Sequence, residues 1–212
     1  MYCSYCERRI PTLLAVEHIQ PKGLAQYAHL EGRWENFLLA CTNCNSTKGD
    51  DDVLLHDVVL PDRDNTFVAF VYSPDGTVQP NPGSGVEALA AKTLALVGLD
   101  RPIATYTDAN GKEVALDRVR QRLDTWAEAQ EVKSEVDLNP GVDAVRRLAV
   151  RTALGKGFFS IWMTVFQSDS DMRDRLINAF SGTRGSGCFD PKTTAPISPA
   201  PNPDGLPNGS KI

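Results

Sequence analysis

Four of the five cysteines in this 212-residue sequence fall into two C-x-x-C pairs, Cys3 with Cys6 and Cys41 with Cys44. Each pair places two thiolates on one side of a tight turn, and two pairs complete the tetrahedral sulfur coordination typical of structural Zn²⁺. A segment of about fifty residues buries too little surface to fold firmly by itself, so a bound metal would supply stability. The spacing therefore predicts a structural zinc site. Chance pairs of structural cysteines and a redox C-x-x-C are the alternatives.

Residues suited to cutting a phosphodiester bond accompany these pairs: Glu17-His18 and Asn36 lie between them, and Asn45 follows directly after Cys44. Hydrolysis needs a base to activate water, a charge to stabilise the crowded phosphorane, and help for the leaving oxygen. One histidine and one oxygen-ligated divalent cation supply all three. Taken singly, His18 suggests a core histidine, Asn36 a turn residue and Asn45 a helix-surface amide. Their grouping with the cysteine pairs favours the catalytic interpretation.

This constellation resembles the HNH (ββα-metal) endonucleases, including the eight residues between Asn36 and Asn45. The resemblance implies DNA cleavage with His18 as general base and Asn36 as a brace for the loop that holds it. It also implies Glu17 and Asn45 as ligands of the catalytic metal. Glu17 stands where Asp or His is common in the family. Asn45 stands where many members have His, as in the H-N-N variants.

A carboxylate and an amide carbonyl make a hard, oxygen-rich site, which favours Mg²⁺ or Mn²⁺ at the catalytic position. Lys22 and Lys48 are candidate phosphate contacts and are expected to be exposed. Lys48 lies about one helical turn from Asn45. The remaining histidines and the solitary cysteine are assigned no catalytic or metal-binding role, namely His29, His56 and Cys188.

More narrowly, the sequence resembles bacterial HNH proteins related to the nuclease subunits of Septu and some retron anti-phage systems. The motifs that carry this resemblance are E-H-I-Q-P-K, W-E-N-F-L-L-A-C and C-N-S-T-K-G. The similarity covers about residues 3–50, with a looser likeness at residues 60–66. It implies a role in antiviral defence beside an ATPase partner. Two rival hypotheses remain: a non-catalytic zinc module that binds nucleic acid or protein, and a nuclease subunit that is inactive without its ATPase.

We expect an α+β protein in three parts: an HNH ββα-metal module over 1–51, a hairpin plus helical accessory region over 52–190, and a Pro-rich disordered tail over 191–212. In the first part, apolar runs predict strands at 13–16 and 37–40. A helix follows at 43–48, with Thr42 as its cap and Gly49 at its end. In the second part, strands at 66–72 and 77–79 flank a turn. Helical periodicity then covers 85–97, 114–133, 142–167 with a break near Gly155 and Gly157, and 169–180.

The formal net charge of −5 argues weakly against DNA binding, because acidic proteins repel phosphates at long range. Residues 1–50 are electrically balanced, and a partner or a local basic groove would supply the attraction. Arginines at 118, 120 and 122 and at 146, 147 and 151 could follow a nucleic-acid backbone, but their acidic neighbours favour a salt-bridged surface. No run of eighteen apolar residues and no secretory signal is present, so we expect a cytoplasmic protein without membrane contact.

Overall fold

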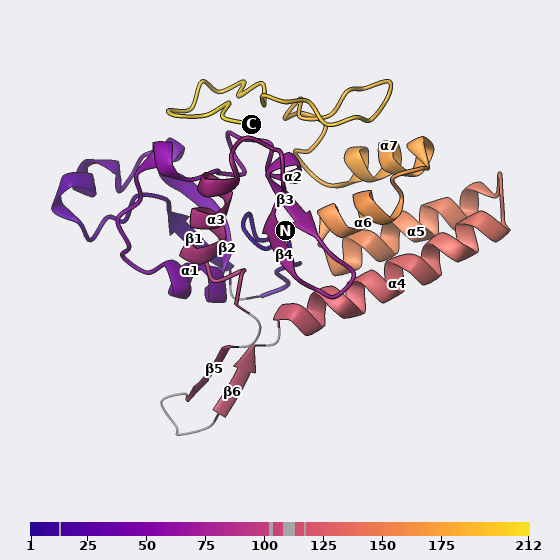
Figure 1. Cartoon of the computed structure of the whole chain (residues 1–212), viewed down its shortest axis with the longest axis horizontal. Coiled ribbons are helices and arrows are strands. Elements are labelled where there is room, and N and C mark those ends of the chain that lie inside the picture. Colours follow the sequence, from indigo (N-terminus) through magenta and orange to yellow (C-terminus); the bar gives the residue numbers. More distant parts are fainter. Residues whose placement is uncertain (13, 102–103, 108–112, 117) are drawn as a thin grey trace.

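The N-terminal segment of the computed structural model is an antiparallel hairpin followed by a short helix (Figure 1). β1 (Leu14–His18) pairs with β2 (Phe37–Cys41), so that His18 lies opposite Phe37. α1 (Thr42–Lys48) starts directly after β2 and ends at Gly49, whose φ of 53° is a backbone conformation that favours glycine. The predicted order of strand, loop, strand and helix is confirmed. The connection between the strands contains two 3₁₀ turns, η1 (Ala25–Leu30) and η2 (Trp34–Asn36).

The structure describes the whole chain except residues 13, 102–103, 108–112 and 117. The first residue of the predicted strand at 13–16 therefore lies outside the described residues, as does position 117 of the predicted helix at 114–133.

The middle of the chain forms a second small hairpin and a helix that packs beside it. A 3₁₀ turn, η3 (Leu55–Asp57), comes first, followed by α2 (Thr66–Ala69), β3 (Phe70–Tyr72), β4 (Val78–Pro80) and α3 (Glu87–Leu96). The strand predicted over 66–72 is thus wrong in its first half. The Asn65 carbonyl accepts hydrogen bonds from Val68 and Ala69 and starts a helical turn there. Local tertiary contacts outweigh the strand propensity of this run.

The C-terminal half is helical after one more hairpin, made of β5 (Ala104–Thr107) and β6 (Glu113–Leu116). The helix expected over 114–133 begins later, because its first residues belong to β6. The four helices are α4 (Arg118–Leu138), α5 (Asp143–Lys156), α6 (Phe159–Val165) and α7 (Ser170–Ala179). The predicted break near Gly155 and Gly157 is confirmed, since Gly157 separates α5 from α6 with a φ of 82°.

The expectation of a disordered tail over 191–212 is wrong. This segment has no helix or strand, but it runs across one side of the molecule and connects the N-terminal segment with the helical half (Figure 1). Ala200 and the terminal Ile212 are buried, and the Ile212 carbonyl accepts hydrogen bonds from Asn65 and Ala200. Proline-rich composition removes backbone donors, but it does not prevent packing when another segment supplies polar partners.

One continuous hydrophobic cluster joins these parts, and it includes the N-terminal cysteines, α3, α6, α7 and Ile212. The aromatic side chains of Phe158, Trp162 and Phe166, in and around α6, are all buried in this cluster. Within the described residues, none of the helices has both the length and the apolar character needed to cross a membrane.

Candidate metal centre and active site

The four paired cysteines meet at one point in the structure. Cys3 and Cys6 lie in the N-terminal turn, Cys41 ends β2, and Cys44 lies in the first turn of α1. All four are buried and unoxidised, and their Sγ atoms lie within 4.8 Å of one another. The Cys6 and Cys41 sulfurs are 3.8 Å apart. A tetrahedron with Zn–S bonds of about 2.3 Å has sulfurs about 3.8 Å apart, so the cluster fits zinc.

Mutual contact also perturbs the acidity of these thiols. Hydrogen bonding from Cys3, followed by Cys44 and Cys6, lowers the pKa of Cys41 far below that of a free thiol. Contacts among the same sulfurs raise the pKa of Cys6 and of Cys44, so a bound cation would be needed to hold all four as thiolates. The turn that carries Cys3 is fixed to the hairpin by the Ser4 N–H, which donates to the Leu39 carbonyl at 2.8 Å.

Glu17 and Lys48 form a buried ion pair between β1 and α1. Glu17 faces α1 from β1, and its Oε1 lies 2.7 Å from Lys48 Nζ. The exposed fraction is 3% for the Glu17 side chain and 1% for the Lys48 side chain. Burial raises the pKa of Glu17, and the Lys48 ammonium opposes that rise. A carboxylate oxygen has two lone pairs, so the buried Glu17 Oε1 can accept a further partner beside the Lys48 ammonium.

His18 is the last residue of β1 and is half-buried, whereas Glu17 beside it is buried. Its Nε2 lies 3.0 Å from the Glu31 carbonyl, and the ring packs edge-on against Phe37. A carbonyl only accepts, so this hydrogen bond places the proton of the neutral imidazole on Nε2 and leaves Nδ1 as the basic nitrogen. Its backbone carbonyl accepts from Lys48 Nζ at 2.9 Å.

Asn36 ties together the two ends of the β1–β2 connection. Its buried Oδ1 accepts from the Gln20 N–H at 2.8 Å, and its Nδ2 donates to the Gln20 carbonyl at 2.9 Å. The Asn36 carbonyl accepts from the Ile19 N–H at 2.9 Å. Three hydrogen bonds thus hold the backbone immediately after His18.

Asn45 lies on α1, three residues before Lys48 and therefore on the same side of the helix. It is half-buried, and within the part of the chain that the structure describes its side-chain amide has no hydrogen-bond partner. The Glu17 carboxylate and the Asn45 amide offer hard oxygen donors, one of them a buried oxygen with an open lone pair. The chemistry of this donor set fits Mg²⁺ or Mn²⁺.

The two lysines differ from each other in their surroundings. Lys22 is exposed, as expected, and its Nζ lies 2.9 Å from Glu31 Oε1. The expected exposure of Lys48 is wrong, because the ion pair with Glu17 draws its ammonium under the hairpin. The signal in the sequence was the three-residue spacing from Asn45, which places Lys48 on the helix face that covers β1.

The arginine clusters of the helical half are mostly engaged within the protein. Arg118 and Arg122 donate to backbone carbonyls of Val97 and Gly76, and Arg120 pairs with a helical neighbour. Arg146 pairs with Asp169 and with Asp171. The salt-bridged interpretation of these clusters is favoured.

Residues 3–51 match the protein family described as HNH endonuclease. This segment is an HNH module. The comparison with curated proteins and the comparison with solved structures gave no match. The HNH family match supports nuclease activity and a nucleic-acid substrate at the level of the family. The matched residues enclose the whole zinc cluster and all of the residues around His18 described above.

Two contacts of the HNH module were not predicted from the sequence. The Glu31 carbonyl that holds His18 lies on the loop, and backbone atoms leave no mark in residue type. The second is Arg63, whose buried guanidinium donates to the Glu35 carbonyl from outside the module. Its neighbours Asp62 and Asp64 were the available signal, because paired charges are what allow an arginine to be buried.

Proposed function

We propose that this protein is a metal-dependent endonuclease that hydrolyses DNA with His18 as the general base. The observation that carries the proposal is the hydrogen bond between His18 Nε2 and the Glu31 carbonyl, because it orients the ring and leaves Nδ1 as the nitrogen that can accept a proton. A base with its proton fixed on the far nitrogen is ready to accept one from water. The family match to residues 3–51 supports the reaction class.

We assign Glu17 and Asn45 as the residues that would hold one Mg²⁺ or Mn²⁺. Such an ion supplies positive charge to the phosphate oxygens and to the leaving oxygen. Glu17 contributes a carboxylate paired with Lys48, and Asn45 contributes an amide oxygen from α1.

Asn36 and Lys48 act as positioning residues in this proposal. Asn36 fixes the backbone on the C-terminal side of His18, whereas Lys48 donates to the His18 carbonyl and pairs with Glu17. One ammonium group thus connects the proposed base with the proposed metal ligand. Phosphate contact remains a prediction for Lys22 and Lys48. Exposure favours Lys22, which needs only to exchange Glu31 for a phosphate oxygen.

The experiment is cleavage of supercoiled plasmid by the purified chain with Mg²⁺ or Mn²⁺. His18→Ala is expected to lower the rate by about 10²- to 10⁴-fold, the usual contribution of a general base. The matched control is His29→Ala, which removes an exposed histidine of the same module and is expected to cut at the normal rate. Equal cutting by the His18 and His29 variants would refute the role of His18.

A subunit that needs a partner is the second candidate, and the net charge of −5 favours it. An acidic chain gains little long-range attraction to DNA, so a basic partner would raise the association rate. Absence of cleavage by the wild-type chain, together with recovery of cleavage on adding a cell extract of its source, would support this candidate. The ATPase identity of that partner, the anti-phage role and the cytoplasmic location are further predictions from the resemblance.

A further inference from the structure

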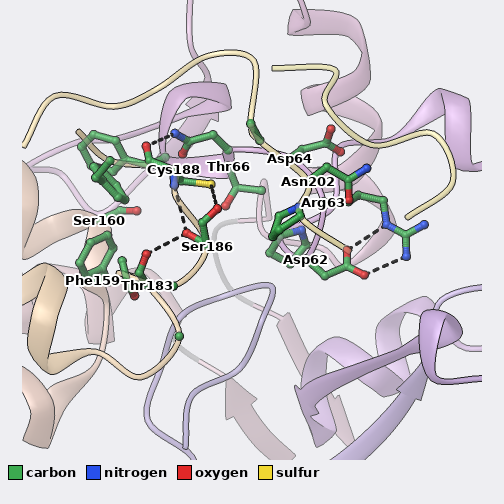
Figure 2. Close-up of a pocket in the computed structure, with 18 of the residues that line it drawn as sticks. Asp62, Arg63, Asp64, Thr66, Phe159, Ser160, Thr183, Ser186, Cys188 and Asn202 are labelled. Atoms are coloured by element: carbon green, nitrogen blue, oxygen red, sulfur yellow. Dashed lines mark hydrogen bonds and ion pairs between the residues drawn. The ribbon is translucent and has the colours of Figure 1, made fainter. Parts of the chain in front are cut away.

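Arg63 is the most thoroughly buried arginine among the described residues, and three separate segments satisfy its guanidinium. Its Nε and Nη2 bind the Asp62 carboxylate at 3.1 and 2.8 Å. Nη2 also donates to the Glu35 carbonyl at 2.9 Å, and Nη1 donates to the Pro207 carbonyl at 2.9 Å. Figure 2 shows the Asp62–Arg63 pair beside Asn202, where the C-terminal tail lines a cavity of about 560 Å³.

The two carbonyls belong to parts of the chain that are far apart in sequence. Glu35 lies in the HNH loop, one residue before Asn36, and Pro207 lies in the C-terminal tail. Neutralisation by Asp62 makes burial of the charge tolerable, and the planar guanidinium reaches both carbonyls at once. The ammonium of a lysine has neither the reach nor the fork geometry for this set of partners.

The residues after Arg63 hold the tail in place. Asp64 accepts from the Lys211 N–H at 2.8 Å and pairs with Lys211 Nζ at 2.9 Å. Asn65 donates its side-chain amide to Cys188 and Ile197 carbonyls and its backbone N–H to Ile212.

The backbone on each side of this contact is also closely packed. The Ser210 N–H donates to the Arg63 carbonyl at 2.8 Å. A Cβ on Gly209 would come within 2.9 Å of Arg63 Cβ, so the tail lies directly against the arginine. The tail therefore forms one side of the Arg63 site and does not merely pass over it.

We propose that Arg63 is a positioning residue through which the C-terminal tail holds the HNH loop, with Asn36, in its working conformation. The contact path runs from the tail to Arg63, from Arg63 to the Glu35 carbonyl, and through the next residue to the backbone that follows His18. The tail is then a working part of the nuclease. The effect on catalysis rests on the proposed function, whereas the ordering of the loop does not.

Hydrogen exchange of the full-length, zinc-loaded chain tests the ordering directly. The reporters are the amides of Ile19, Gln20 and Asn36, which are bonded within the loop. Arg63→Lys, and Gly209→Ala, whose added Cβ would lie 2.9 Å from Arg63 Cβ, are both expected to raise their exchange rates about tenfold or more. Arg147→Lys is the matched control, because that arginine is exposed and pairs only along its own helix, and it is expected to change nothing.

Unchanged exchange of the three amides in either altered chain would overturn the proposal. Loss of zinc and of far-ultraviolet circular dichroism in both chains would also overturn it, because the contact would then support the whole fold and not the loop. Plasmid cleavage adds a second readout. In both altered chains kcat is expected to fall about fivefold or more, with KM for DNA unchanged. Arg63→Lys is expected to retain more activity than Arg63→Met. If the wild-type chain is inactive but the exchange pattern is as expected, the nuclease proposal is refuted and the role of Arg63 in ordering the loop stands.

Discussion

Replacing Lys48 with Met removes the ammonium that lies 2.7 Å from Glu17 Oε1 and leaves a carboxylate with an exposed fraction of 3%. Exposed ion pairs contribute at most about 1 kcal/mol, but this pair is shielded from solvent and salt. Breaking a buried pair from one side costs about 3–5 kcal/mol, because the remaining charge is left without a partner. This cost of about 3–5 kcal/mol includes the loss of the hydrogen bond from Lys48 to the His18 carbonyl. We therefore expect the free energy of unfolding to fall by about 3 kcal/mol or more.

The double variant Glu17→Gln, Lys48→Met removes both charges and is expected to lie within about 1 kcal/mol of the wild type, since isosteric neutral groups often replace a buried pair at little cost. Urea unfolding at constant free zinc, followed by circular dichroism, measures all the chains of this double-mutant cycle. A coupling free energy below about 0.5 kcal/mol would refute the buried pair as a structural contact.

The pH dependence of the single variant gives a further check. Burial raises the pKa of Glu17 even with Lys48 present, and loss of the ammonium raises it further. A carboxyl whose pKa is higher in the folded than in the unfolded chain favours folding below its unfolded pKa, and this contribution is lost as the pH rises through the folded value. The deficit of Lys48→Met is therefore expected to be largest at neutral pH and to shrink on acidification. A deficit that is constant with pH would contradict this reasoning.

Three further predictions follow from the contacts of the HNH module. Metal analysis is expected to find about one zinc per chain, and Cys44→Ser or a strong chelator is expected to unfold the module, seen as lost circular dichroism; a metal-free folded chain would contradict the four-thiolate site. Gly157→Ala is expected to destabilise the protein by about 1–3 kcal/mol in thermal unfolding, because residue 157 has a φ of 82° and its Cβ would lie 2.5 Å from the Glu7 carbonyl oxygen. The control is Gly155→Ala, whose Cβ would lie in open space, and it is expected to be neutral or stabilising. Asn36→Ala is expected to lower kcat for plasmid cleavage about tenfold with normal zinc content, since the loss of the two side-chain bonds to Gln20 frees the backbone after His18; an unchanged kcat would show that the brace is not needed.

Residue type and spacing alone were sufficient to predict the cysteine cluster of the HNH module. Two C-x-x-C pairs have few uses other than tetrahedral metal binding, and the cluster of four sulfurs follows from them. The strands around His18 and Asn36 and the helix carrying Asn45 were also predicted, because short apolar runs and a terminal glycine are local signals. The roles of the site residues in catalysis remain predictions.

Local signals failed where distant segments decide the outcome. The run at 66–72 has strand propensity, but Asn65, which donates to the Ile197 and Ile212 carbonyls, begins a helical turn there. The predicted helix at 114–133 begins late because its first residues pair with β5. The proline-rich composition of residues 191–212 suggested disorder, because no local pattern records that Asp64 and Asn65 supply hydrogen bonds to that segment.

The sequence by itself determined that four cysteines suited to zinc would meet and that a hairpin and a helix would follow one another, because both depend on spacings shorter than one module. The roles of the residues around His18 stay predictions. Only the tertiary structure decided that Lys48 is buried against Glu17, and that the Glu31 carbonyl holds the His18 ring. Only the tertiary structure, again, joined the tail to the HNH loop through Arg63. These contacts use backbone carbonyls and buried charges, whose partners are chosen by the folded chain and not by neighbouring residue types.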